Sequence, residues 1–136
     1  VETCESFGDE TAGLSAVQIG VMRRMFVVRR IDLEPESWEV MINPKVTILD
    51  NHQTEYWEGC MSIGTGEDRL FGPVPRAKKA KVEYLDVSGA EHSLEVSDYM
   101  AHIVLHELDH LEGKLFLQYI DNPRNIWRGG DLDKYL

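Results

Sequence analysis

Short runs of β-branched and aromatic residues dominate the first part of the chain. Residues 21–31 include Phe26-Val27-Val28 between polar positions, which predicts a strand. Residues 39–49 have the same character but are interrupted at Asn43-Pro44, so we expect two short strands with a turn or edge position at the proline. Residues 53–58 alternate between polar and apolar positions and predict a further strand.

A Gly- and Pro-rich segment follows at residues 64–75. Its three glycines and two prolines argue against long regular structure, so we expect a loop or an irregular edge there. Residues 80–87 then alternate with a period of two, residues 88–91 have turn character, and residues 92–96 return to strand character. This pattern predicts a β-hairpin.

One later segment has helical rather than strand character. We expect a helix from Tyr99 to about Glu112, with Asp98 as its N-cap and Gly113 at its C-terminal stop. Its apolar positions include Ile103, Leu108 and Leu111.

Length and composition favour a single globular unit. The chain has 136 residues, of which 43% are hydrophobic and 28% charged, well away from the composition of disordered proteins. No internal repeat, low-complexity tract or interdomain linker interrupts it. We therefore expect one α+β domain over residues 1–136.

Charge and apolar patterning exclude several partner classes. The formal net charge of −10 repels nucleic-acid backbones and anionic membrane surfaces. The longest apolar stretches are far shorter than the ~20 residues of a membrane-spanning helix. The two cysteines, Cys4 and Cys60, are too few for a disulfide scaffold and fit a reducing compartment. We therefore expect an intracellular chain with neither nucleic-acid nor membrane partners.

The strongest chemical signal is the sequence His106-Glu107-Leu108-Asp109-His110. Two histidines four residues apart on a helix share one face, so both rings can bind one metal ion. The intervening Glu107 can then lie beside the open metal position, where it can take a proton from water. On this short motif alone, a chance pair of surface or core histidines is also possible.

A catalytic site of this kind needs a third protein ligand and an open position. Downstream of His110 there is no further His or Cys, and Glu112 and Asp121 are the candidate carboxylates. Upstream stands Cys60, at the end of an aromatic strand and directly after a glycine, where a thiolate would complete a His-His-Cys set. An inert buried cysteine is the alternative for Cys60.

Three motifs together resemble those of the peptide deformylase family. That family combines a GxGLAAxQ loop, an EGCLS strand end and an HExDH helix in this order. The counterparts here are residues 11–18 (TAGLSAVQ), 58–62 (EGCMS) and 106–110 (HELDH), with Thr11 in place of the first glycine and Ser15 in place of the first alanine. Further matching segments are Ile42-Asn43-Pro44, Val74-Pro75-Arg76 and residues 111–116 (LEGKLF).

The resemblance implies a metal centre and a proton donor and acceptor. It implies that Cys60, His106 and His110 ligate the metal and that Glu107 acts as general base and later as acid. Gln18 and the backbone N–H of Met61 would then bind the formyl oxygen. One divalent ion per chain is implied, with Fe²⁺ the usual physiological metal and Zn²⁺, Ni²⁺ or Co²⁺ able to replace it.

The resemblance also implies a peptide-binding surface and a fold. Small antiparallel or mixed sheets would pack around the central HExDH helix. Tyr99 and His102 stand where relatives place aliphatic residues that receive the methionine side chain. Either they weaken or redirect the methionine preference, or they turn away into hydrogen bonds with neighbours. The implied substrate-binding residues are Ala12, Gly13, Tyr56, Glu58, Gly59, Tyr99, His102 and Ile103.

The function implied is removal of the formyl group from N-formylmethionyl peptides of nascent proteins, by a monomer in a bacterial-type cytoplasm or in an organellar matrix after transit-peptide removal. Ribosome docking through a basic terminal helix is unsupported, because Asn122-Pro123 breaks the chain and the tail is of mixed charge. We expect the tail to fold back, with Trp127 and Tyr135 as anchors.

Two other functions remain open at this point. One is a non-catalytic or altered-specificity relative that holds the metal and binds peptide N-termini. The other is a zincin-like endopeptidase, which needs a third ligand downstream of the helix, and the motif around Cys60 argues against it.

Overall fold

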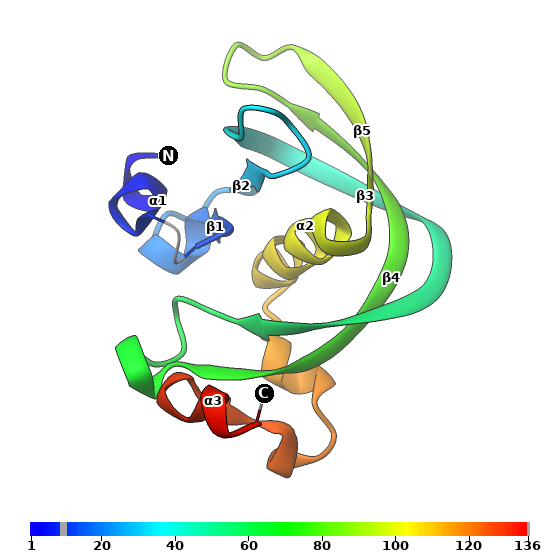
Figure 1. The fold of residues 1–136 in the computed structure, drawn as a ribbon. Helices are drawn as coiled ribbons and strands as arrows, with labels where there is room; N and C mark the ends of the chain where they lie inside the picture. Colours follow the sequence, from blue (N-terminus) through cyan, green and yellow to red (C-terminus); the bar gives the residue numbers. More distant parts are fainter. Residues whose placement is uncertain (9–10, 136) are drawn as a thin grey trace.

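The computed structural model describes residues 1–8 and 11–135. Within them, an antiparallel sheet surrounds one long helix (Figure 1). The strands are β1 (Gly13–Ser15), β2 (Met25–Arg30), β3 (Ser37–Gly59), β4 (Leu70–Leu85), β5 (Glu91–Ser97) and β6 (Trp127–Arg128). The α-helices are α1 (Glu2–Ser6), α2 (Asp98–Leu111) and α3 (Leu132–Tyr135). The short 3-10 helices are η2 (Ala16–Ile19), η3 (Gly66–Asp68), η4 (Phe116–Tyr119), η5 (Pro123–Asn125) and η6 (Gly129–Asp131).

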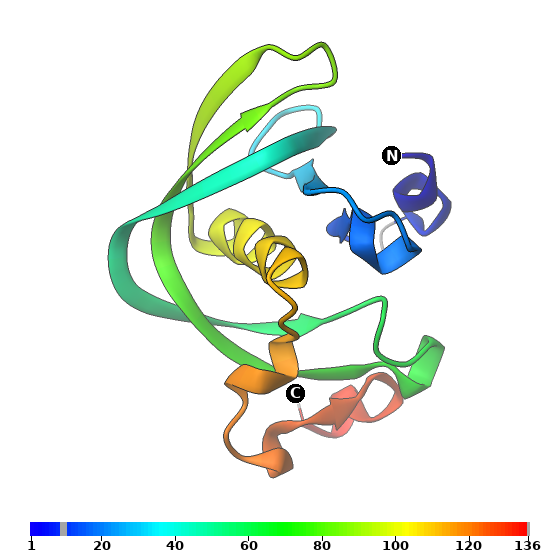
Figure 2. The same ribbon diagram turned by 180° about the vertical axis from the view of Figure 1, so that it is seen from behind.

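The sheet has the order β1-β2-β3-β4-β5, and β6 pairs with the start of β4. The long strands β3 and β4 are strongly curved, and α2 lies in the concave side of the sheet (Figures 1 and 2). The predicted α+β class, with sheet packed around the HELDH helix, is therefore confirmed.

The main core lies between α2 and the sheet. Met100, Ile103 and Val104 follow the spacing that places residues on one helical face, and all three are buried. They pack in one cluster with residues from β2, β3, β4 and β5, namely Phe26, Val28, Met41, Ala80, Val82, Tyr84 and Val96. This packing fixes the helix, and with it the histidines on the helix, against the sheet.

The prediction of separate strands between residues 39 and 58 is wrong. The structure has one continuous strand, β3, of 23 residues. Asn43 has a positive φ of 50°, and the pairing with β4 shifts register between Ile42 and Lys45. The Asn-Pro sequence therefore produces an irregularity within the strand rather than its end, as bulges do.

The prediction of a loop over residues 64–75 holds only for its first part, because β4 begins at Leu70. Pro73 and Pro75 pair with Trp57 and Glu55 of β3. On the other side of β4, the pairing with β6 reaches only to Phe71, so no described strand on that side needs an N–H from either proline. This is how two prolines are accommodated within a strand.

The predicted β-hairpin and the predicted helix are both present, but the N-cap residue of the helix was predicted wrongly. β4 and β5 pair across the turn near Gly89, and α2 ends just before Gly113, whose φ is +76°. The N-cap position of α2 is Ser97, and Asp98 is the first helical residue. None of the helices in the described ranges is long and apolar enough to cross a membrane.

The tail returns to the sheet, as expected. After η5 the chain forms β6, in which Trp127 pairs with Phe71 and Arg128 with Leu70. The backbone N–H of Gly129 donates to the carbonyl oxygen of Arg69 at 2.8 Å. The other expected anchor, the side chain of Tyr135, lies outside what the structure describes.

Candidate metal centre

Three potential metal ligands meet where the end of β3 faces α2. Cys60 follows the last residue of β3, and His106 and His110 lie one turn apart on α2. The Nε2 atom of His110 is 3.3 Å from the Sγ atom of Cys60 and 3.2 Å from the Nε2 atom of His106. All three donor atoms lie within 4.8 Å of one another. The structure therefore brings together the three residues that the sequence indicated.

This donor set fits a divalent transition metal. One thiolate and two imidazoles suit zinc, iron, cobalt or nickel better than the oxygen-preferring magnesium and calcium. Metal–ligand bonds of about 2.0 to 2.3 Å place tetrahedral donors roughly 3.3 to 3.7 Å apart. The observed separations of 3.2 and 3.3 Å are close to this range. Three protein donors leave a fourth position for a reactant.

The ionisation of Cys60 favours metal binding, whereas that of His106 opposes it. Burial raises the pKa of the Cys60 thiol, but hydrogen bonds with His106, His110 and the backbone of Ser62 outweigh it and lower that pKa to about 6. Burial lowers the pKa of His106, but hydrogen bonds to Cys60 and Glu58 raise it to about 10. The thiolate is the form that binds a metal, and binding to the His106 Nε2 atom requires release of its proton.

A buried carboxylate orients one of the histidines. The Nδ1 atom of His106 lies 2.7 Å from the Oε1 atom of Glu58. Arg76 donates to both oxygens of Glu58, at 2.6 and 2.9 Å, and to Asp109 at 2.8 Å. Burial raises the pKa of Glu58, but hydrogen bonds from Arg76, His102 and His106 hold it well below its usual range. Such a carboxylate leaves the Nε2 atom of His106 available to a metal.

Glu107 lies beside the donor set and is only 3% exposed. Its Oε1 atom is 3.9 Å from the Nε2 atom of His106. The Ser15 hydroxyl lies 2.7 Å from the backbone oxygen and 2.8 Å from the Oε2 atom of Glu107, so its proton can be donated to either. Burial raises the pKa of Glu107, while the two histidines and Ser15 oppose the rise. A raised pKa makes this carboxyl group a better proton donor than an ordinary glutamic acid.

Gln18 directs its amide toward the same place. Its Nε2 atom donates to the Ser62 hydroxyl at 2.9 Å and approaches the Cys60 Sγ atom at 3.5 Å. Its Oε1 atom accepts a hydrogen bond from the backbone N–H of Ser15 at 2.8 Å. The side-chain amide of Gln18 is therefore held next to the proposed metal ligands.

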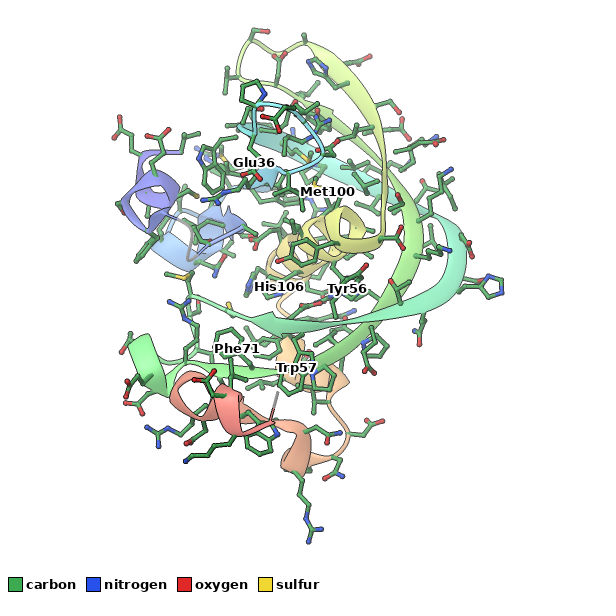
Figure 3. All side chains as sticks on the ribbon, in the orientation of Figure 1. Glu36, Tyr56, Trp57, Phe71, Met100 and His106 are labelled. Carbon is green, nitrogen blue, oxygen red and sulfur yellow. The ribbon has the colours of Figure 1, made fainter. Side chains whose placement is uncertain are left out.

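A cavity of about 170 Å³ opens onto these groups. Figure 3 shows His106 on α2 together with Trp57 and Phe71 on the sheet. Sequence reasoning did not single out three of the lining residues, because no motif spacing distinguishes them. These are Trp57, Arg69 and Phe71, whereas Thr11, which also lines the cavity, was identified as a position of the first motif. The anticipated residues that line the cavity are Ala12, Gly13, Gln18, Glu58, Gly59, Cys60, Met61, Tyr99, His102, Ile103, His106 and Glu107.

Of the three ring-bearing residues expected to bind substrate, Tyr99 and His102 line the cavity and Tyr56 does not. Tyr56 is not among the cavity-lining residues, and its ring instead packs against those of Tyr99 and His102, with centroids 5.5 and 4.7 Å away. The nitrogens of His102 contact Glu58 and Thr54. For His102, the structure therefore favours the alternative of hydrogen bonds to neighbours.

Gly13 and Gly59 are required by close packing at the cavity. A Cβ atom at Gly13 would lie 3.0 Å from both the Cγ atom of Glu107 and the carbonyl oxygen of Val27. A Cβ atom at Gly59 would lie 2.5 Å from the ring of Phe71. Both glycines therefore allow a backbone to approach a side chain that borders the cavity.

Comparison with known proteins agrees with this site. The family model for polypeptide deformylase matches residues 1–125. The chain belongs to this family. Among its relatives, the peptide deformylase of Stenotrophomonas maltophilia is 39% identical over 108 residues, covering 79% of this chain and 60% of the relative. The peptide deformylase of Saccharophagus degradans is 41% identical over 112 residues, covering 81% of this chain and 61% of the relative. The chain thus spans about three fifths of the length of these family members.

Solved deformylase structures share the fold. The peptide deformylase of Thermus thermophilus superimposes with a TM-score of 0.73 at 36% identity, covering 88% of this chain and 68% of that one. A probable peptide deformylase from Synechococcus phage S-SSM7 gives a TM-score of 0.76 at 32% identity, covering 88% of this chain and 79% of that one. The curved sheet around α2 is therefore the architecture of the family.

Proposed function

We propose that this chain is a metal-dependent hydrolase that removes the formyl group from the N-terminal formylmethionine of nascent proteins. The observation that carries the proposal is the clustering of three donor atoms within 4.8 Å of one another, with Glu107 and Gln18 lining the same cavity. Membership of the deformylase family supports the same activity.

Cys60, His106 and His110 would hold one divalent ion. When bound, the ion supplies Lewis acidity, which polarises a carbonyl group and makes water acidic enough to react near neutral pH. We propose Fe²⁺ as the physiological metal, with Zn²⁺, Ni²⁺ or Co²⁺ as substitutes, on the basis of the family resemblance. The thiolate and imidazole donors are compatible with all four.

Glu107 serves as the proton carrier of the reaction. Its carboxylate takes a proton from the attacking water and later gives a proton to the nitrogen of the leaving amine. The burial that raises the pKa of Glu107 favours this second role, because a carboxyl group of ordinary pKa is a poor proton donor at neutral pH. Ser15 holds one oxygen of the carboxylate while this transfer takes place.

Gln18 and the backbone N–H of Met61 bind the formyl oxygen as negative charge develops on it. The Gln18 amide is already oriented by Ser15 and Ser62, so little reorganisation is needed on reaching the transition state. A neutral amide donor stabilises this charge without itself losing a proton.

The peptide would lie between β1, which begins at Gly13, and the end of β3 that carries Gly59. Both glycines border the cavity, and their backbones can pair with an extended peptide. We propose formylated nascent chains as the partners, in a bacterial-type cytoplasm or an organellar matrix.

The decisive experiment measures formate release from a formyl-Met-Ala-Ser peptide by anaerobically prepared, iron-loaded protein. The wild-type chain is expected to release formate, and Glu107→Ala is expected to lose about 10²- to 10⁴-fold in kcat, the usual contribution of general acid–base catalysis. Metal content, measured in parallel, should be unchanged.

A matched control is Glu112→Ala, which removes a half-exposed carboxylate just after the same helix. This variant should keep wild-type turnover. Absence of formate release from a folded chain that holds one metal ion would contradict the proposal and support the peptide-binding alternative instead.

A further inference from the structure

His102 lies one turn before His106 on α2, and both of its ring nitrogens have polar contacts. The Nδ1 atom is 2.9 Å from the Oε2 atom of Glu58. The Nε2 atom is 3.0 Å from the carbonyl oxygen of Thr54 and 3.4 Å from its hydroxyl. The ring packs edge-on against Tyr56 and is only 1% exposed. The side chain is therefore fixed between α2 and β3.

Hydrogen-bond direction at Glu58 follows from its contacts with Arg76. The guanidinium of Arg76 has only donors and contacts both oxygens of Glu58, so both oxygens act as acceptors. The Nδ1 atom of His102 is thus the donor to Oε2, as the Nδ1 atom of His106 is the donor to Oε1. Two histidines one turn apart therefore share one carboxylate, each on a different oxygen.

The orientation of Glu58 matters to the metal centre because Glu58 orients His106. A carboxylate that accepts from Nδ1 fixes the ring and directs the Nε2 atom toward the other donors. Arg76 holds Glu58 from the β4 side, and His102 holds it from α2. Without His102, Glu58 loses the hydrogen bond that holds its carboxylate from the α2 side.

We propose that His102 is a positioning residue of the metal centre, which acts through Glu58 to fix the ring of His106. This inference rests on the metal site of the proposed function. It gives His102 a role distinct from receiving the substrate side chain, because its polar atoms are engaged with Glu58 and Thr54.

Three substitutions separate the contacts of His102. In His102→Asn the amide nitrogen takes the place of Nδ1 and keeps the donor to Glu58. In His102→Gln the amide takes the place of Nε2 and keeps the contact with Thr54, whereas His102→Leu removes both. The readouts are the affinity for Co²⁺, the rate of Co²⁺ transfer to a chelator, and the visible spectrum of the Co²⁺-loaded protein.

The Leu and Gln variants are expected to bind Co²⁺ about threefold to tenfold more weakly and to show an altered spectrum. This loss is smaller than the about 10- to 100-fold typical of removing a direct outer partner of a metal ligand, because His102 acts through Glu58. The Asn variant should stay within about twofold of the wild type, since it keeps the donor.

His52→Leu is the control for adventitious binding, because His52 is an exposed imidazole whose described partner is Asp50 and not Glu58. It should leave the Co²⁺ affinity unchanged. If His102→Leu fails to fold, the comparison of Asn with Gln still decides, as both place an amide at this position.

Equal affinities for the wild type and the Leu variant, or an Asn variant as weak as Gln, would overturn the proposal. Because these measurements use no substrate, they are independent of formate release. A chain that binds Co²⁺ as expected but releases no formate would contradict the proposed activity while leaving the role of His102 intact.

Discussion

At the scale of single residues, Gln18 is held at both ends of its amide. The backbone N–H of Ser15 donates to one end, and the other end donates to Ser62 and approaches Cys60. Such a fixed donor stabilises developing charge more effectively than a mobile one, because it needs no reorganisation during the reaction. Its role is therefore measurable separately from metal binding.

We predict that Gln18→Leu lowers kcat for formate release by about 10²- to 10³-fold, the usual cost of removing one donor to a developing oxyanion. The content of bound metal should be unchanged, because the three proposed ligands stay in place. Steady-state kinetics together with metal analysis provide the check. A loss of metal that accounts for the loss of rate would contradict this role.

Short-range spacing predicted part of the site, and long-range contacts supplied the rest. The spacing of His106 and His110 follows from helical geometry, so their meeting at one point could be expected from the sequence. The contact of Ser15 with Glu107 joins residues 92 positions apart, and Arg76 reaches Asp109 across 33 positions. Sequence periodicity carries no information on such pairs.

At the scale of elements, the strands were easier to locate than to delimit. The alternating segments from Ser37 to Gly59 all lie in β3, but turn-forming Asn43-Pro44 suggested a break that the structure absorbs as an irregularity. Pairing with β4 continues on both sides of this point. Tertiary pairing therefore overrides the local preference, which a pattern read along one segment does not capture.

The C-terminal strand β6 supports one wall of the cavity. It pairs with Leu70 and Phe71, and the ring of Phe71 lies between Gly59 and Gly129. The tail thus fixes a residue that lines the cavity, and β6 itself extends the sheet alongside the start of β4 (Figure 2).

We predict that Trp127→Ala raises KM for the formyl peptide by up to about tenfold, which corresponds to ~1.4 kcal/mol, with little change in kcat. The physical reason is that a loosened Phe71 weakens peptide binding without disturbing the metal ligands. Arg124→Ala, an exposed change in the same tail, is the control. An unchanged KM would show that β6 does not support peptide binding.

At the scale of the whole molecule, the proposed metal ligands connect the sheet to the helix. Cys60 belongs to the end of β3, whereas His106 and His110 belong to α2. A metal bound to all three binds the folded chain and not the unfolded one. Its binding free energy therefore adds to the free energy of unfolding.

We predict that Zn²⁺ at about 1,000 times its dissociation constant stabilises the folded chain by about 4 kcal/mol. The melting temperature should rise on loading and fall again with a chelator, as measured by circular dichroism. Cys60→Ser should lose most of this gain. Cys4→Ser should keep it, because Cys4 is buried in a separate cluster with Leu14 and Val27. Equal gains in both variants would contradict the proposed ligand set.

Arg76 ties together two acids that belong to different motifs. Its guanidinium contacts Glu58 of the EGCMS segment and Asp109 of the HELDH segment, and all three side chains are buried. If either Glu58 or Asp109 is replaced, the buried Arg76 guanidinium keeps only one of its two carboxylate partners. The loss of stability caused by replacing the second acid therefore depends on whether the first is still present. The two segments are therefore epistatic: a substitution acceptable in one is conditional on the identity of its counterpart in the other.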